Sequence, residues 1–278
     1  MAYRQDGSSL SNPVTLAQGG TNASLTAANG SLFYSTASAG ALLAINAQAG
    51  AWLASNGTIP VWSTPSNSFY YYDDCTNKGL WDSRASGTGT SADTGTPDAN
   101  HPGIFTLQTG TTNAGKASFN YTVANGSDNG NFFFGGGNFT WVGYINIPVL
   151  ATNIDDYAYY VGMHNGWVFG TPNDGTYFQY IRSNSVNWQI VSNNNGTATT
   201  TTSSVAVTTG WHKLVMTATP SAITYFVDGV SIGTISTNLP ATNAYALCGH
   251  LINKSAGTTN VIVNMDYFSF FQNMTNAR

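Results

Sequence analysis

Short alternating runs of apolar and polar residues, separated by turn residues, make up most of the chain after residue 68. Thirteen segments carry this strand pattern: 103–109, 116–123, 132–134, 139–147, 157–163, 176–182, 188–191, 197–207, 211–218, 223–227, 230–235, 244–251 and 260–271. No window of a dozen residues shows the 3.6-residue period of an amphipathic helix. With no room for crossover helices between the strands, the pattern predicts an antiparallel β-sandwich or barrel.

The clearest local signal is a hairpin at residues 225–233 (YFVDGVSIG). Its centre, Asp228-Gly229, tolerates the positive φ angles that a two-residue hairpin turn requires. We therefore expect strands on both sides of this pair.

The first 65 residues have a different pattern. Ala-Gly-Ala-Leu-Leu-Ala at residues 39–44 recurs ten residues later as Ala-Gly-Ala-Trp-Leu-Ala at 49–54. One short strand of this kind cannot bury its apolar face alone, so such repeats stack or associate with other chains. A flexible linker is the alternative. We predict an attachment and trimerisation segment at residues 1–65 and a β-sandwich at 66–278.

Composition supports β-structure and narrows the function. Only 7% of the residues are charged, the net charge is −4, and the sequence contains no glutamate. The shortage of Glu and Lys disfavours helices, and eight scattered basic residues offer no nucleic-acid footprint. Aromatic residues at 13% argue against disorder. A polar, weakly charged surface of this kind is typical of fibrous and virion proteins.

Neither membrane insertion nor a disulfide framework is expected. The first residues (MAYRQDGSSLSNP) are polar, and the apolar stretches are too short to span a bilayer. Cys75 and Cys248 lie far apart and form no metal-binding spacing. Two buried, reduced thiols are the default expectation, and a disulfide between them is the alternative.

The N-terminal segment resembles a known family of segments. Gly-Gly-Thr-Asn at 19–22, Gly-Ser-Leu-Phe-Tyr-Ser at 30–35, the Ala-Gly repeats and Ile-Pro-Val-Trp at 59–62 stand in an order similar to that of bacteriophage tail-fibre and appendage proteins. The resemblance implies a homotrimer in a virion, assembled in the host cytoplasm. Its N-terminal segment would contact other virion proteins.

A second resemblance covers most of residues 73–271. Trp-His-Lys-Leu at 211–214, followed by Tyr-Phe-Val-Asp-Gly at 225–229, is similar to a hairpin of concanavalin-like and laminin-G-like jelly rolls. His-Pro-Gly at 101–103 and Met-Asp-Tyr-Phe at 265–268 follow the order found in phage structural proteins with this domain. The resemblance implies an all-β fold, a concanavalin-like antiparallel sandwich (jelly roll) behind a β-rich trimerising stalk.

The residues disfavour catalysis. Retaining glucanases with this fold need two carboxylates on one face of a strand, and the adjacent pairs Asp73-Asp74 and Asp155-Asp156 point to opposite faces of a strand. A lyase could use His164 or His212, but no catalytic spacing surrounds them. We therefore expect no enzyme and no required cofactor.

Calcium is the one metal considered, because laminin-G-like domains hold it with loop oxygens. Asp155, Asp156 and Asp174 lie in or beside Asn-rich loops. No Asp-x-Asp-x-Asp-Gly loop is present, so these residues do not define a ligand set.

Glycan binding is the best chemical hypothesis, since aromatic faces stack on sugars while amides and carboxylates contact hydroxyl groups. The stretch from His164 to Trp188 concentrates these residue types. The candidate ligand-binding residues are Trp167, Asp174, Tyr177, Tyr180, Arg182 and Trp188. Strand alternation must bury part of this set.

Together these patterns predict a phage tail-fibre or appendage protein that adheres to host-surface glycan through several weak sites. Two alternatives stay open. One is a purely structural virion component, such as a head fibre or decoration protein, and the other is a polysaccharide-degrading tail enzyme.

Overall fold

A computed structural model describes residues 31–36, 39–44, 52–55, 58–63, 68–77, 79, 81–92, 97, 99–121, 132–134, 137–165, 169–240, 244–245 and 247–274. The chain divides into two compact units, residues 1–66 with 277–278, and residues 67–276. The division lies next to the boundary expected from composition. The attachment function expected of the first part stays a prediction.

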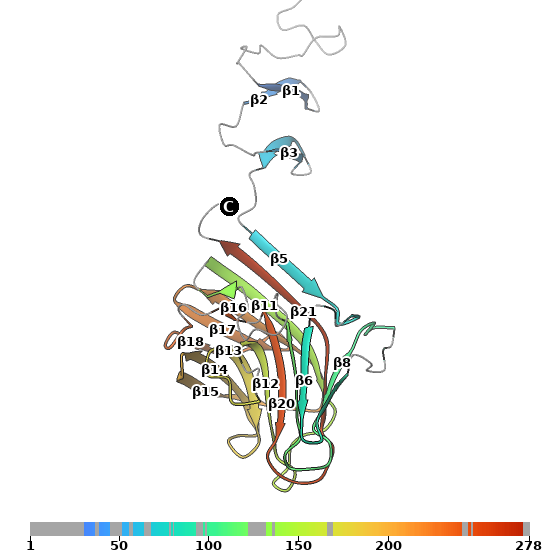
Figure 1. Ribbon diagram of the computed structural model, residues 1–278. Helices are drawn as coiled ribbons and strands as arrows, with labels where there is room; N and C mark the ends of the chain where they lie inside the picture. Colours follow the sequence, from blue (N-terminus) through green and yellow to red (C-terminus); the bar gives the residue numbers. More distant parts are fainter. Residues whose placement is uncertain are drawn as a thin grey trace, which may run out of the picture. The chain divides into compact units, whose positions relative to one another are not determined.

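Two short hairpins form the described part of the first unit (Figure 1). Their strands are β1 (Leu32–Ser35) with β2 (Gly40–Leu43), and β3 (Trp52–Ser55) with β4 (Pro60–Ser63). The Trp62 indole links them by donating to the Ala44 carbonyl oxygen at 2.6 Å. Each hairpin is a separate two-stranded sheet, and Leu32, Phe33 and Leu53 are exposed.

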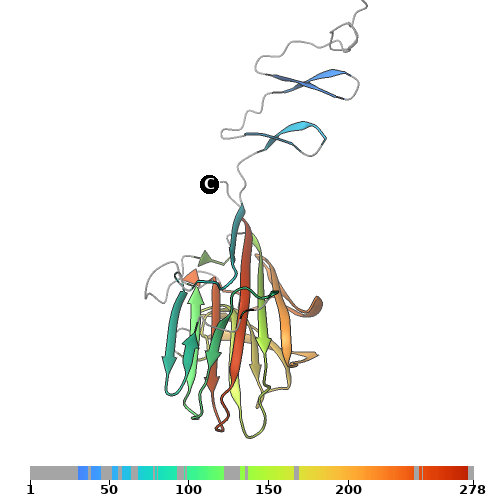
Figure 2. The ribbon, with the colours of Figure 1, turned by 90° about the vertical axis from the view of Figure 1, so that its right-hand side faces the viewer.

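Two antiparallel sheets build the second unit (Figures 1 and 2). The eight-stranded sheet has the order β18 (Val230–Ile235), β17 (Ala222–Val227), β16 (Gly210–Thr219), β11 (Gly137–Ile147), β21 (Ile262–Met274), β8 (Phe105–Gln108) and β7 (Thr90–Ala92), with β5 (Ser68–Asp73) also paired to β21. The seven-stranded sheet has the order β15 (Thr197–Ala206), β14 (Asn187–Asn194), β13 (Gly175–Ile181), β12 (Tyr157–His164), β20 (Cys248–Lys254), β9 (Lys116–Tyr121) and β6 (Trp81–Ser86). A small sheet joins β10 (Phe132–Phe133) to β19 (Ala244–Tyr245).

The core lies between the two large sheets and follows from strand alternation. Along β11, Phe139, Trp141 and Ile145 are buried, whereas Val142 and Tyr144 on the opposite face are partly exposed. Buried residues of both sheets belong to one hydrophobic cluster. The Trp141 indole donates to the Leu247 carbonyl oxygen at 2.9 Å, which satisfies a polar group inside the core.

The predicted fold class is confirmed: the unit is an all-β, antiparallel, jelly-roll-like sandwich. All thirteen predicted strand segments contain strand, and the turn at Asp228-Gly229 has the expected positive φ angles of 50° and 82°. Segment 244–251 was expected as one strand but contains two, β19 and β20. Strands β5, β6 and β7 were not predicted, because their sequences alternate poorly.

Two further sequence expectations concern the cysteines and membranes. Cys75 and Cys248 are both free and buried, and desolvation raises the pKa of each thiol well above its usual value. Within the described ranges, no helix is long and apolar enough to cross a membrane.

Candidate functional site

Four of the six predicted ligand-binding residues are buried, and this burial corrects the expected stacking surface. Tyr180 and Trp188 point into the core, where Tyr180 packs edge-on against Tyr157 and Trp188 edge-on against Phe178. Trp188 has 0% exposure, so its ring offers no face to a ligand. Trp167 lies outside the described residues, and Arg182 is partly exposed at the end of β13.

Tyr177 and Asp174 are buried for a different reason. Tyr177 faces away from the core, but it packs with Tyr160 and Leu251 in a second hydrophobic cluster on the outer face of the seven-stranded sheet. The chain itself covers this cluster, because the Tyr177 hydroxyl donates to the Pro172 carbonyl oxygen at 3.0 Å. Asp174 accepts the Asn195 backbone N–H at 3.2 Å. Sequence alternation could not reveal this covering segment.

The carboxylates considered for calcium have protein partners. Asp155 accepts the backbone N–H and the hydroxyl of Thr259, both at 2.8 Å, and Lys254 Nζ lies 4.0 Å from its Oδ1. The hydrogen bonds from Thr259 lower the pKa of Asp155. Among the described residues, no three His, Cys, Asp or Glu side chains gather as a metal-binding group.

The histidines considered for acid–base chemistry are enclosed. His164 and His250 are completely buried, and desolvation lowers the pKa of His164 to about 4 and that of His250 to about 3. His250 Nδ1 lies 2.9 Å from the Tyr159 hydroxyl. His212 is buried, with Nδ1 2.7 Å from Asp228 Oδ2 at the predicted hairpin turn.

The outer face of the eight-stranded sheet carries a feature that the sequence did not predict. Five rings from different parts of the chain follow one another across it, and we call them the aromatic row: His101, Trp211, Tyr144, Tyr267 and Tyr72. Successive ring centroids are separated by 4.0, 5.2, 5.6 and 5.8 Å. The first three contacts are stacked, and the last is tilted by 35°.

The two ends of the aromatic row differ. At one end, His101 stacks on both Trp211 and Tyr144, and it is anchored because its Nδ1 lies 2.9 Å from Asp266 Oδ2. At the other end, Tyr72 on β5 is 49% exposed. The inner rings of the row cover one another's faces, so Tyr72 is the member best placed to offer a ring to a ligand.

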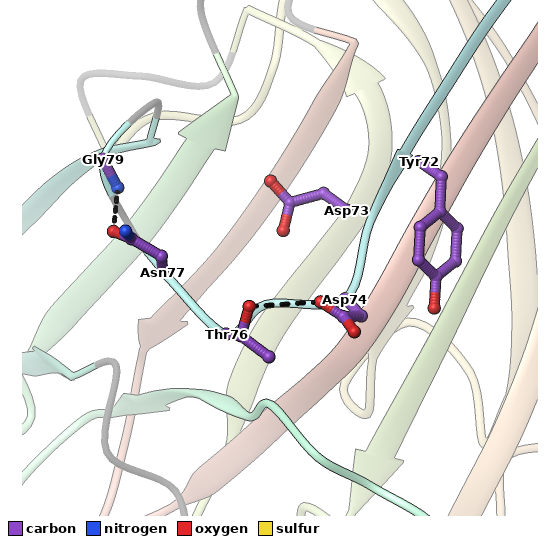
Figure 3. A pocket seen from close by; sticks show the side chains of 6 residues that line it. All are labelled: Tyr72, Asp73, Asp74, Thr76, Asn77 and Gly79. Carbon is purple, nitrogen blue, oxygen red and sulfur yellow. Dashed lines mark hydrogen bonds between the residues drawn. The ribbon is translucent and has the colours of Figure 1, made fainter.

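Tyr72 also forms one side of a shallow surface pocket of about 300 Å³ (Figure 3). The other lining residues are Asp73 at the end of β5 and, from the connection between β5 and β6, Asp74, Thr76, Asn77 and Gly79. Figure 3 shows Tyr72 on one side and Asn77 on the other, with Asp74 and Thr76 between them. An aromatic ring, a carboxylate, a hydroxyl and an amide therefore share one opening.

Asp73 supports this pocket from inside. Its carboxylate accepts the Cys75 backbone N–H at 2.8 Å, the Trp81 indole N–H at 3.0 Å and the Tyr71 hydroxyl at 3.3 Å. Buried Trp81 thus fixes the end of β5 and the turn that follows. Cys75 adopts a φ of 54° in this turn, a conformation that few non-glycine residues adopt.

Asp74 and Asn77 are the polar side chains best placed to contact a ligand. Asp74 Oδ1 accepts the Thr76 hydroxyl at 3.2 Å, which leaves a second carboxylate oxygen outside that bond. Asn77 is exposed and uses its Oδ1 to accept the Gly79 backbone N–H at 2.8 Å, a bond that does not involve its amide donors. The clustered Tyr-Tyr-Tyr-Asp-Asp of residues 70–74 was the available sequence signal. The carboxylate pair within this run does not by itself indicate that the tyrosines beside it are exposed.

Solved structures with a similar fold are distant in sequence. The β-glucanase of Bacillus licheniformis is 16% identical over 72% of this chain and 97% of its own, with a TM-score of 0.47. A botulinum neurotoxin type C structure, titled for its interaction with two ganglioside molecules, is 15% identical over 71% of this chain and 44% of its own, with a TM-score of 0.44. The binding domain of Paraclostridial Mosquitocidal Protein 1 is 16% identical over 70% of this chain and 45% of its own, with a TM-score of 0.42. This chain thus spans less than half the length of the last two structures.

Sequence comparison is more informative about the family. No curated protein matches the chain. A family model described as SO2946-like, C-terminal domain, matches residues 100–266, which are 167 of the 278 residues. The match includes the thirteen strands β8 to β20 in full and the beginning of β21. The chain therefore belongs to the family of proteins with an SO2946-like C-terminal domain.

Proposed function

We propose that this chain is a non-enzymatic adhesion subunit of a phage appendage that binds surface carbohydrate through the pocket beside Tyr72. The observation that carries the proposal is the exposed Tyr72 ring next to Asp74, Thr76 and Asn77 in one opening. Sugars are bound by this combination, because a ring packs on C–H groups while carboxylate, hydroxyl and amide groups exchange hydrogen bonds with hydroxyls.

The aromatic row supports this function by fixing the ring in place. Tyr72 packs on Tyr267, which stacks on Tyr144 in the middle of the sheet. A ring held by neighbours loses little conformational freedom when a ligand binds. A shallow, open pocket is suited to weak binding of a chain end or a branch.

Weak binding sites hold a cell surface only when several copies act together, and features of the first unit support such an association of copies. Its hairpins are isolated two-stranded sheets with exposed Leu32, Phe33 and Leu53. Such hairpins are marginal on their own in water, so association with further copies would stabilise them. We propose a homotrimer, the state implied by the resemblance of residues 14–62 to tail-fibre segments. Three linked pockets would raise the effective concentration at a cell surface.

The positions of the ionisable groups favour binding over catalysis. His164 and His250 are enclosed in the sandwich. In the pocket, the Asp73 carboxylate already accepts hydrogen bonds from three protein donors. A hydrolytic pair would need both carboxylates on the same substrate.

A glycan array printed with neutral, amino-bearing and acidic oligosaccharides tests the proposal. The full-length chain should bind a subset, and Tyr72→Ala should lose most of that signal. Phe226→Ala is the matched control, because Phe226 is a partly exposed aromatic residue of β17 on the same sheet but does not line the pocket. An array with no signal from the wild-type chain would refute the adhesion function and favour a purely structural virion protein.

A further inference from the structure

A buried lysine lies at one end of the sandwich. The side chain of Lys254, the last residue of β20, has 0% exposure, although lysine is almost never fully buried unless its charge is paired. Its ammonium donates to the carbonyl oxygen of Thr259 and, at 3.5 Å, to that of Gly110. Asp155 Oδ1 lies 4.0 Å from the same nitrogen. We call these two carbonyl oxygens and the Asp155 carboxylate the oxygen cage.

Three connections of the chain supply the oxygen cage. Gly110 lies between β8 and β9, Asp155 between β11 and β12, and Thr259 between β20 and β21. Each of these connections passes from one large sheet to the other, because β8, β11 and β21 belong to the eight-stranded sheet and β9, β12 and β20 to the seven-stranded sheet. The ammonium therefore contacts three crossings between the sheets at once.

The oxygen cage is positioned by hydrogen bonds that do not involve the ammonium. Asp155 accepts the backbone N–H and the hydroxyl of Thr259, both at 2.8 Å, and the Gly110 backbone N–H donates to Asn260 Oδ1 at 2.7 Å. A Cβ at Gly257 would lie 1.9 Å from Asp155 Oδ1, so a glycine lets this loop close on the carboxylate. Carbonyl and carboxylate oxygens gathered in this way are the ligands of hard cations.

We propose that the oxygen cage is a cation site and that the Lys254 ammonium is its resident cation, in place of a metal ion. An ammonium carries three N–H donors, which match the three oxygen groups of the cage. The chain thus supplies its own cation to hold the crossings together, and this end of the sandwich needs no metal. A cage emptied by shortening Lys254 accepts a free primary ammonium ion, because that ion has the same charge and the same donors. The inference does not depend on the pocket beside Tyr72.

Chemical rescue of a shortened side chain tests this inference. Lys254→Ala removes the part of the side chain that n-propylammonium reproduces, and it should lower the melting temperature of the full-length chain by about 10 °C. n-Propylammonium chloride should restore part of this loss in a saturable manner. Tetramethylammonium chloride at the same concentration has the same charge but no N–H donor, so it should not. Lys213→Ala is the matched control, because Lys213 is an exposed lysine of β16 and its variant should respond equally to both salts.

A second pair of variants covers the case in which Lys254→Ala does not fold. Lys254→Met keeps an apolar stem but leaves the Asp155 carboxylate without its cation, whereas Asp155→Asn leaves the ammonium without its anion. The double variant should lose less stability than the two single variants together.

The expected result is rescue of Lys254→Ala by n-propylammonium alone and a non-additive double variant. Equal effects of the two salts on Lys254→Ala would overturn the inference. If that variant does not fold, additive losses of stability for Lys254→Met and Asp155→Asn would overturn it instead.

Discussion

Exposure separates two groups of aromatic residues that have the same chemistry. Trp188 and Tyr180 fill the core between the sheets, whereas Tyr72 and Tyr70 lie at the surface of β5. Only the second group can offer a ring to a ligand or a partner. The difference arises because Trp188 and Tyr180 face the core between the sheets, whereas Tyr70 and Tyr72 lie on the exposed face of β5.

At the residue scale, the two buried histidines predict a pH-dependent stability. His164 and His250 have folded-state pKa values lowered to about 4 and about 3, against about 6.5 in an unfolded chain. Below pH 6.5 these two imidazoles take up protons in the unfolded state but stay neutral in the folded state. The free energy of unfolding should therefore be greatest above pH 6.5 and fall toward pH 5, with a limiting slope of about 1.4 kcal/mol per pH unit for each histidine.

Urea unfolding between pH 7.5 and 5 measures this effect, because aspartates contribute little change in that window. His250→Asn should remove about half of the slope, whatever it does to stability at pH 7.5. A stability that stays constant from pH 7.5 to 5 would contradict the burial of both side chains.

At the element scale, the hairpin from β17 to β18 shows how local sequence specifies structure. Asp228 and Gly229 adopt positive φ, as the two-residue turn requires. Asp228 also accepts the Lys213 backbone N–H at 2.8 Å and contacts His212. The turn therefore joins two strand pairs, β16–β17 and β17–β18, which a sequence motif alone does not show.

Gly229→Ala should destabilise the sandwich by about 1 kcal/mol. No atom lies within 4 Å of the added Cβ, so the effect comes only from the φ of +82°. Gly170→Ala is the control, because that glycine also has open space and does not adopt positive φ. Thermal unfolding of both variants measures the difference. Equal melting temperatures for the two variants would count against a strained turn.

The strands were more predictable than the site, for physical reasons. Alternation reports which residues point to opposite faces, and it predicted the strands β11 and β16, in which alternate residues are buried. It does not report what covers the outer face. The aromatic row joins rings at positions 72, 101, 144, 211 and 267, and only the register of four strands and one loop brings them together.

At the scale of the whole molecule, a sandwich with a continuous core contrasts with a first unit of two separate hairpins. The sandwich has the burial needed to fold by itself. The hairpins do not, because their apolar side chains remain exposed in a single copy. In the proposed trimer, association of copies would cover these side chains.

Light scattering on the full-length chain should give about three times the single-chain mass of 29.3 kDa. Removing residues 1–66 should give a folded monomer at micromolar concentration, because it removes the hairpins whose exposed apolar side chains favour association. A full-length chain that stays monomeric would contradict the trimeric stalk.

Titration calorimetry with the oligosaccharide selected on the array tests the central claim, carbohydrate binding at Tyr72, most directly. Tyr72→Ala should raise the Kd of the full-length chain about tenfold, equivalent to about 1.4 kcal/mol, while Phe226→Ala leaves it within about twofold. Both variants should unfold at the same temperature as the wild-type chain, since both side chains lie at the surface. An unchanged Kd for Tyr72→Ala would contradict the assignment of this pocket as the carbohydrate site.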